Sequence, residues 1–177
     1  MINTVLQNGK NITSGKVLMH EHVRCASNDL IHTFGEKWID ESGLIDFAAE
    51  ILSNLREKYG LSIFVDGTPI DSGRDVRILR AVSEKSGVDI VASSGLYYFE
   101  NCYTMSRSED EIASWFIDEC KLGIEGTDIK PGILKCASQD TITDNNRKRL
   151  RAMAIAQKQT NLPLYVHSNH RDDLAIQ

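Results

Sequence analysis

Five short apolar runs recur along the chain, and several of them end at glycine or at a polar residue. They occupy positions 17–19, 61–67, 88–95, 132–138 and 162–168. Runs of this length that are rich in β-branched residues are typical of parallel strands buried on both faces. We therefore predict five strands at these positions.

Helical patterns fill the segments between the predicted strands. Apolar residues within 44–59 fall on one helical face, and Gly60 stands where a helix cap is expected. Ser108 and Glu111 match a capping box, which opens a helix expected to bury Trp115. The other two predicted helices run from Val76 to near Gly87 and from Leu150 to just before Asn161.

The alternation of strand and helix predicts a parallel sheet with right-handed crossovers, either an open doubly wound sheet or a (β/α) barrel. In both architectures the chemistry lies at the carboxyl ends of the strands. An open sheet normally carries a glycine-rich phosphate loop after its first strand, whereas this chain has HEHVRC there. That segment is therefore the first place to look for functional residues.

The composition is that of a folded globular protein. The 177 residues fit one domain, with 41% hydrophobic and 25% charged residues. A net charge of -5 argues against a nucleic-acid partner, because a phosphate-binding surface is usually basic. No stretch approaches the ~20 apolar residues of a membrane span, so we expect no membrane partner and a cytoplasmic location.

His20 and His22 follow the first apolar run and are separated by one residue. Alternate residues of a strand point to the same side, so both imidazoles would face one way. Imidazole nitrogens are good ligands for zinc and similar metals. The alternative is a polar strand end with two half-exposed histidines, and the pair on its own favours that alternative.

Two further residues at predicted strand ends change this balance. Lys135 lies in the apolar run GILKCAS, and a lysine is rarely buried without a partner. In a dry site its neutral amine would be favoured, and a neutral amine can add carbon dioxide to become a carbamate. Alternatively, Lys135 reaches past a helix end on the outside of the sheet. His167 lies near the end of the last run, directly after its apolar residues, whereas we expect His170 to lie in a solvated loop.

These motifs, in this order, resemble the phosphotriesterase-like branch of the amidohydrolase superfamily. The matching segments are SGKVLMHEHV, VDGTPIDSGRD, IVASSGLYY and LGIEGTDIKPGILKCAS, followed by the histidine of PLYVHSNH. The resemblance implies an α/β fold, a (β/α)8 barrel of the TIM type, of which this chain holds about the first five β/α units. Residues 1–177 would then form the N-terminal portion of a single metal-dependent hydrolase barrel domain.

The resemblance also implies a binuclear metal site. His20 and His22 match the ligands of the more buried metal, and His167 matches a ligand of the more exposed one. Lys135 matches a carbamylated lysine that bridges both metals. The implied cofactors are two divalent ions, zinc first with manganese or cobalt as alternatives, and carbon dioxide for the N-carboxylation of Lys135. A metal-bridging hydroxide would act as the nucleophile.

Tyr97 matches an aromatic pocket position at which the lactonases of the family carry tyrosine. The resemblance therefore implies a small-molecule ester or lactone substrate, and a lactonase or related ester hydrolase. Phosphotriesterase activity is the alternative within the family. Members are often homodimers, so a homodimer is one expected assembly.

The family pattern includes two residues that have no counterpart among these 177 residues. They are a further histidine ligand on a sixth strand and a proton-transferring aspartate after the eighth. Asp66 and Asp71 lie in a loop where the family uses no ligand. We therefore expect an N-terminal part of a longer enzyme, inactive by itself, and assign no catalytic residue within it. A truncated, non-catalytic scaffold or binding protein is the alternative.

Overall fold

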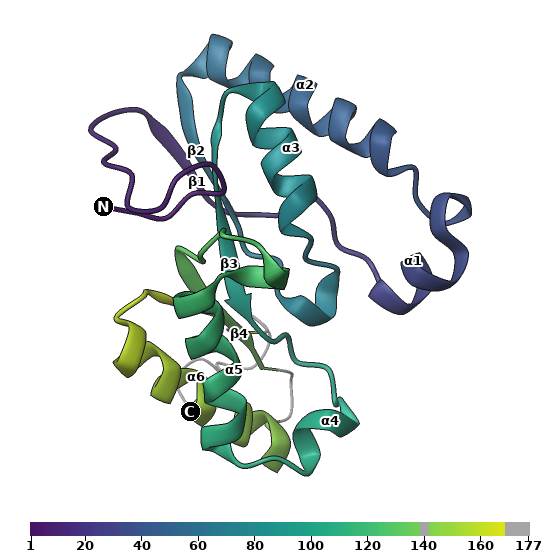
Figure 1. Ribbon diagram of the computed structural model, residues 1–177, viewed down its shortest axis with the longest axis vertical. Coiled ribbons are helices and arrows are strands. Elements are labelled where there is room, and N and C mark those ends of the chain that lie inside the picture. Colours follow the sequence, from purple (N-terminus) through teal and green to yellow (C-terminus); the bar gives the residue numbers. More distant parts are fainter. Residues whose placement is uncertain (139–141, 169–177) are drawn as a thin grey trace.

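The structure, a computed structural model, describes residues 1–138 and 142–168. All five predicted strands are present: β1 (Lys16–Glu21), β2 (Leu61–Asp66), β3 (Asp89–Gly95), β4 (Ile133–Ala137) and β5 (Leu164–His167). They pair in parallel in the order β1-β2-β3-β4-β5. The sheet curls, with the helices along its outer side (Figure 1). The chain therefore folds as part of a (β/α) barrel, as the sequence predicted.

The helices within the described residues are α1 (Asn28–Phe34), α2 (Glu41–Tyr59), α3 (Val76–Ser86), α4 (Cys102–Met105), α5 (Glu109–Leu122) and α6 (Asp144–Thr160). Gly60 and Asn161 end α2 and α6 in the left-handed conformation, and Ser108 and Glu111 form the predicted capping box of α5. The short α1 and α4 were not predicted, because few residues give no periodic pattern. No helix among the described residues combines the length and apolar character of a membrane span.

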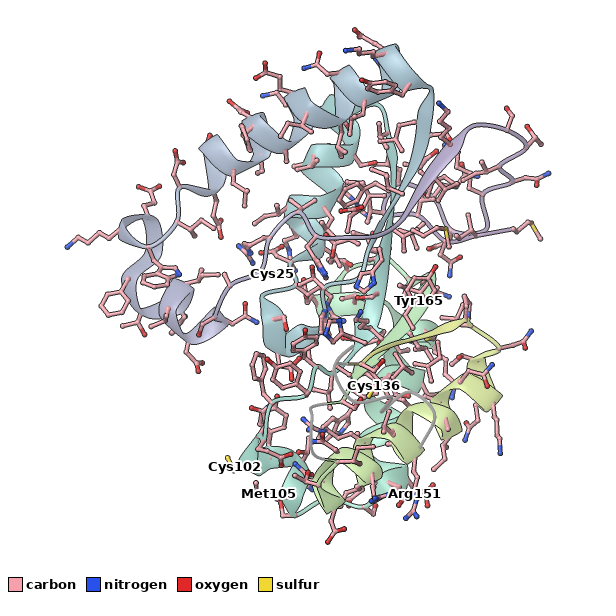
Figure 2. The ribbon with its side chains drawn as sticks, turned by 180° about the vertical axis from the view of Figure 1, so that it is seen from behind. Cys25, Cys102, Met105, Cys136, Arg151 and Tyr165 are labelled. Carbon is pink, nitrogen blue, oxygen red and sulfur yellow. The ribbon has the colours of Figure 1, made fainter. Side chains whose placement is uncertain are left out.

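Two apolar layers pack the helices against the sheet. α2 packs on α3 beside β2 and β3, whereas α5 packs on α6 beside β3 and β4 (Figure 1). Along β4, Leu134 and Cys136 are buried among helix residues, while Ile133 packs inside the curl of the sheet. Tyr165 of β5 joins this inner cluster, near the centre of the molecule in Figure 2. Because side chains alternate along a strand, Lys135 also faces the inner side.

The predicted buried faces of two helices are partly wrong. Phe47, on the predicted apolar face of α2, is 64% exposed, and Trp115 of α5 is 36% exposed. Instead, α2 buries Ala49 and Leu52. Apolar spacing reveals that a segment is helical, but the side that is buried depends on how the helix lies against its neighbours, here α3.

Candidate metal-binding site and pocket

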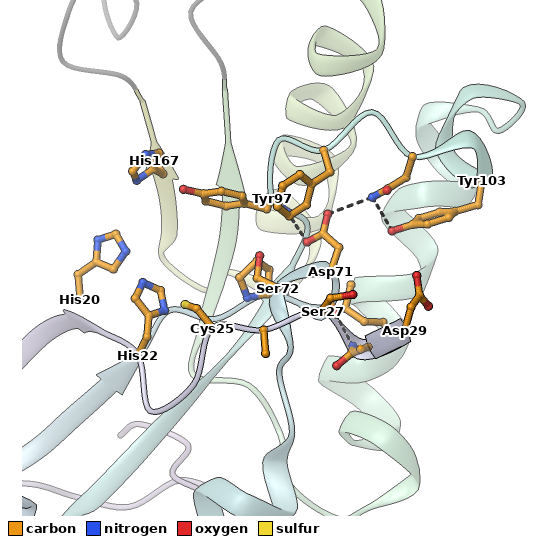
Figure 3. A pocket seen from close by; sticks show the side chains of 16 residues that line it. His20, His22, Cys25, Ser27, Asp29, Asp71, Ser72, Tyr97, Tyr103 and His167 are labelled. Carbon is orange, nitrogen blue, oxygen red and sulfur yellow. Dashed lines mark hydrogen bonds between the residues drawn. The ribbon is translucent and has the colours of Figure 1, made fainter. Parts of the chain in front are cut away.

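Three of the four candidate ligands lie at the carboxyl ends of strands, at the same end of the sheet, and Lys135 lies in the middle of β4. His20 belongs to β1 and His22 follows it, Lys135 belongs to β4, and His167 ends β5. Figure 3 shows the three imidazoles gathered on one side of a pocket. Loops at the carboxyl ends of parallel strands converge, so the fold itself brings these distant residues together.

A local irregularity in β1 turns His20 toward the inner side of the sheet. Leu18 packs against the helix layer, so strict alternation would turn His20 the same way. However, the pairing of β1 with β2 shifts in register between Leu18 and Glu21, as in a β-bulge. The His20 ring consequently lies 6.3 Å from the inward-facing Tyr165 ring, between centroids. Sequence alternation alone did not predict this irregularity.

Lys135 is the most buried of the four candidates, with 1% of its surface exposed. Its Nζ lies 2.8 Å from Nε2 of His20. Burial lowers the pKa of Lys135 to about 8, because removal from water disfavours the charged ammonium. The pKa of His20 is also lowered, first by burial and then by the positive charges of Lys135 and the other two histidines. Both nitrogens are thereby biased toward their neutral forms, which have lone pairs.

Thr68 holds His22, although no sequence motif marks this threonine. The Thr68 hydroxyl lies 2.9 Å from Nδ1 of His22 and 3.2 Å from the backbone oxygen of Arg24. The hydroxyl has one proton, which it donates to the Arg24 carbonyl, so it accepts a hydrogen bond from Nδ1–H. His22 is therefore held as the Nδ1–H tautomer, and its Nε2 keeps a lone pair for a ligand.

Asp66 connects the loops that follow β1 and β2. Its buried carboxylate accepts hydrogen bonds from the backbone nitrogens of Val23, at 2.8 Å, and Thr68, at 2.9 Å. Burial raises the pKa of Asp66, and these hydrogen bonds oppose the increase. At Gly67 a Cβ would lie 3.0 Å from Cδ2 of His20. A glycine at this position therefore lets the backbone approach the imidazole closely.

The histidines form one end of a pocket of about 1090 Å³. Tyr97, the predicted aromatic pocket residue, lines it, and its ring centroid lies 5.4 Å from that of His167. The segment that follows β3 also contributes Phe99, Asn101 and Tyr103 to the lining of the pocket. The start of α1 and the loop after β2 line the rest of the described pocket (Figure 3).

Asp71 joins the loop after β2 to the loop after β3. Its carboxylate accepts hydrogen bonds from the backbone nitrogen of Tyr97, at 2.7 Å, and from the side chain of Asn101, at 3.2 Å. Asn101 also donates to the Tyr103 hydroxyl at 2.7 Å. Burial, and then the neighbouring Asp71, raise the pKa of Tyr103 to about 12. Tyr103 therefore remains neutral at physiological pH.

The donor types at the histidine end suit a divalent metal such as zinc, but they are not assembled as a complete cluster. Among the described residues, no group of three or more histidine, cysteine, aspartate or glutamate side chains is placed to hold a metal ion. The His20 and His22 rings have centroids 5.3 Å apart. A carbamate on Lys135 would add anionic oxygens beside His20, and these are the donors that the site otherwise lacks.

The sequence located the candidate donors but not the residues that hold them. Asp66 and Asp71 were set aside because the family uses no ligand there, and both instead fix backbone in the loops around the site. For Asp66, the available signal was an aspartate that directly ends an apolar run. Cys25, a free cysteine, also lines the pocket. His170 lies outside the described residues.

Comparison with known proteins adds to this geometry. The sequence model of the phosphotriesterase family matches residues 1–177. An aryldialkylphosphatase of Saccharolobus solfataricus is 32% identical over 166 residues, which cover 92% of this chain and 52% of the relative. A phosphotriesterase homology protein of Mycobacterium tuberculosis is 31% identical, covering 88% of this chain and 50% of its own. An N-acetyltaurine hydrolase of Bos taurus is 30% identical, covering 76% and 37%. The chain thus spans about half the length of the first two curated relatives.

Proposed function

The chain belongs to the phosphotriesterase family, and from that premise we propose that it acts as a metal-dependent hydrolase of ester bonds. The substrate would be a small-molecule lactone or related ester. His20, His22 and His167 would bind two divalent ions, zinc first with manganese or cobalt as alternatives. Lys135, as a carbamate, would complete the set of ligands.

One observation carries this proposal, and it is the placement of Lys135. A lysine with a purely structural role normally extends its ammonium to water or to a carboxylate. In the described part of the chain, Lys135 instead has its Nζ 2.8 Å from His20 Nε2, with 1% of the residue exposed and no carboxylate in an ion pair with it. A buried amine beside an imidazole favours chemistry that needs neutral nitrogen.

Carbamate formation on Lys135 needs carbon dioxide as its one co-reactant. The neutral amine nitrogen attacks the carbon of carbon dioxide, so that an N–C bond forms while one C=O π bond breaks and its electron pair moves to oxygen. One N–H proton leaves to solvent, and the product is a carbamate anion. When bound, two divalent ions would supply an activated hydroxide and would polarise the oxygen of the bond to be cleaved. Thr68 keeps Nε2 of His22 available, and Tyr97 stands beside His167 to contact the substrate.

The charge of the pocket supports an uncharged substrate. Asp29 and Asp71 line the pocket, and no described lining residue is a lysine or arginine. An anionic substituent such as a sulfonate would find no cationic side chain there, whereas lactones and phosphotriesters are neutral. Tyr97 favours a lactone, and the name of the archaeal relative supports a phosphotriester as the second substrate class.

Metal analysis of the product of the complete gene tests this function. We expect two metal ions per chain, and hydrolysis of lactones or phosphotriesters that a chelator abolishes and zinc, manganese or cobalt restores. His22→Asn should lose metal, whereas His32→Asn, at an exposed histidine of α1 outside the pocket lining, should retain it. A wild-type protein that binds none of these metals at any stoichiometry would contradict the proposal.

A second candidate is a non-catalytic scaffold or binding protein. It is favoured by the lack of a three-donor metal cluster of histidine, cysteine or carboxylate side chains in residues 1–138 and 142–168. For such a protein, ligands would bind in the pocket without metal and would be released unchanged. Product analysis after incubation with lactones separates the two candidates.

A further inference from the structure

Arg149 of α6 has a fully buried side chain, and its polar contacts lie in one loop. Its guanidinium donates hydrogen bonds to the backbone oxygen of Tyr98, at 2.8 Å, and to that of Phe99. It also lies 3.5 Å from the Glu100 carboxylate. Its Nε has no hydrogen-bond partner among the described residues. All hydrogen bonds and ion pairs of this side chain among the described residues are therefore with residues 98–100.

A buried guanidinium is unfavourable unless hydrogen bonds replace those that it made with water. Glu100 compensates for this charge only in part, because the same carboxylate accepts three other hydrogen bonds. Their donors are the side chains of Thr143, at 2.7 Å, Asn145, at 2.8 Å, and Asn146, at 2.6 Å. These residues lie at the start of α6, where a carboxylate is favoured by the helix dipole. α6 thus holds the loop in two places, at Glu100 and at the two backbone oxygens.

The loop that α6 holds is one wall of the pocket. We call residues 97–103 the aromatic wall, because Tyr97, Phe99 and Tyr103 line the pocket from this segment. On the other side of the wall, Asp71 accepts a hydrogen bond from the Tyr97 backbone nitrogen. The wall is therefore held between α6 and the loop after β2, and its ring positions depend on both attachments.

We propose that Arg149 is a positioning residue that fixes the aromatic wall and thereby sets which substituents the pocket accepts. The planar guanidinium binds two successive carbonyls at once, which restrains both peptide planes on either side of Phe99. Without it, the Tyr98 carbonyl loses its donor, the Phe99 carbonyl keeps only the Asn101 backbone N–H, and α6 holds the wall through Glu100 alone. The consequence for substrate choice rests on the proposed function, whereas the consequence for wall order does not.

The test compares Arg149→Met with Arg151→Met in the product of the complete gene. Arg151 lies on the same helix, 69% exposed and at the periphery in Figure 2, so it controls for the loss of an arginine from α6. Amide hydrogen exchange in residues 97–101 should accelerate about tenfold or more in Arg149→Met, an increase that corresponds to the loss of roughly one hydrogen bond. Arg151→Met should exchange like the wild type.

Kinetics supplies the second measurement. In Arg149→Met we expect KM for esters with bulky substituents to rise roughly tenfold, the effect of losing one or two pocket contacts, with kcat for the smallest ester and the metal content unchanged. If wild-type protein hydrolyses no ester, the proposed function fails, but the exchange comparison still decides the role of Arg149. Unchanged exchange in residues 97–101 would overturn the proposal.

A second variant covers the case in which Arg149→Met does not fold. Arg149→Lys keeps a buried cation and most of the volume but cannot bind two carbonyls in one plane, so the same faster exchange is expected. If both variants unfold globally while Arg151→Met folds, Arg149 serves the stability of the core, and the proposal is wrong.

Discussion

The histidine end of the pocket rests on strands, whereas the aromatic wall, which runs from Tyr97 beside His167 to Tyr103 at the other end, is a loop held by side chains (Figure 3). His20 and Lys135 belong to β1 and β4, whose backbones are fixed by the parallel sheet. The wall, residues 97–103, is held from two sides. Arg149 binds its backbone and the start of α6 binds Glu100, while Asp71 on the other side binds the Tyr97 backbone nitrogen. The difference suggests a division of roles, with donors placed by the fold and substrate contacts placed by replaceable side chains.

The largest expected effect comes from Lys135→Ala and is confined to the histidine end of the pocket. Lys135→Ala removes the amine that would become the carbamate, so we expect loss of bound metal and of all hydrolysis. Within the described residues the Lys135 side chain has no hydrogen bond to the aromatic wall, so amide exchange in the wall should stay like the wild type. Lys121→Ala, at an exposed lysine of α5, is the control. Retained metal and activity in Lys135→Ala would contradict the proposed ligand role of Lys135.

The pH dependence of stability, measured on metal-free protein, tests the burial of Lys135 separately from its proposed role as a ligand. Its pKa is about 8 in the folded chain, against an ordinary value of 10.5. Between these two values the folded state binds fewer protons than the unfolded state, so the free energy of unfolding should rise with pH. The total rise from this group is at most about 3 kcal/mol.

Denaturant titrations in carbon dioxide-free buffer with a chelator, at intervals from pH 7 to 10.5, measure this rise. Lys135→Met has no titrating group at this position, so its advantage over the wild type should be largest below pH 8 and should shrink as the pH increases. A constant difference between the two proteins across the series would mean that Lys135 is not desolvated in the folded state.

The two ends also differ in how far the sequence predicts them. Apolar runs and the motifs at their ends predict the strands, the main helices and the approximate place of His20, Lys135 and His167. The attachment of the wall does not, because Arg149 and Tyr98 are 51 residues apart and neither residue type signals the contact. The same limit applies to Phe47, whose exposure depends on how α2 lies against α3. Short-range patterns predict elements, whereas contacts between elements need the packed structure.

A smaller effect at the histidine end comes from Thr68→Val. Valine keeps the shape of threonine but removes the oxygen that accepts the hydrogen bond from His22 Nδ1–H. We expect metal affinity to fall roughly 10- to 100-fold, the usual effect of losing a residue that orients a metal ligand. Competition with a chromophoric chelator measures the affinity. Thr127→Val, a hydrogen-bonded threonine outside the pocket lining, should leave it unchanged.

The smallest expected effect is at the opposite end. Asp71→Asn can still accept a hydrogen bond from the Tyr97 backbone nitrogen through its amide oxygen, but its NH₂ group would face the Asn101 amide, which is itself a donor. With one hydrogen bond lost and Arg149 still in place, KM should rise by roughly 2- to 10-fold, while metal affinity stays constant.

The control is Asp29→Asn, which changes the same group elsewhere in the pocket. Asp29 has no hydrogen bond or ion pair within the described residues, so this variant should leave KM within error of the wild type. A loss of metal in Asp71→Asn would show that the two ends are coupled, and the division between strand-borne donors and a loop-borne wall would then fail.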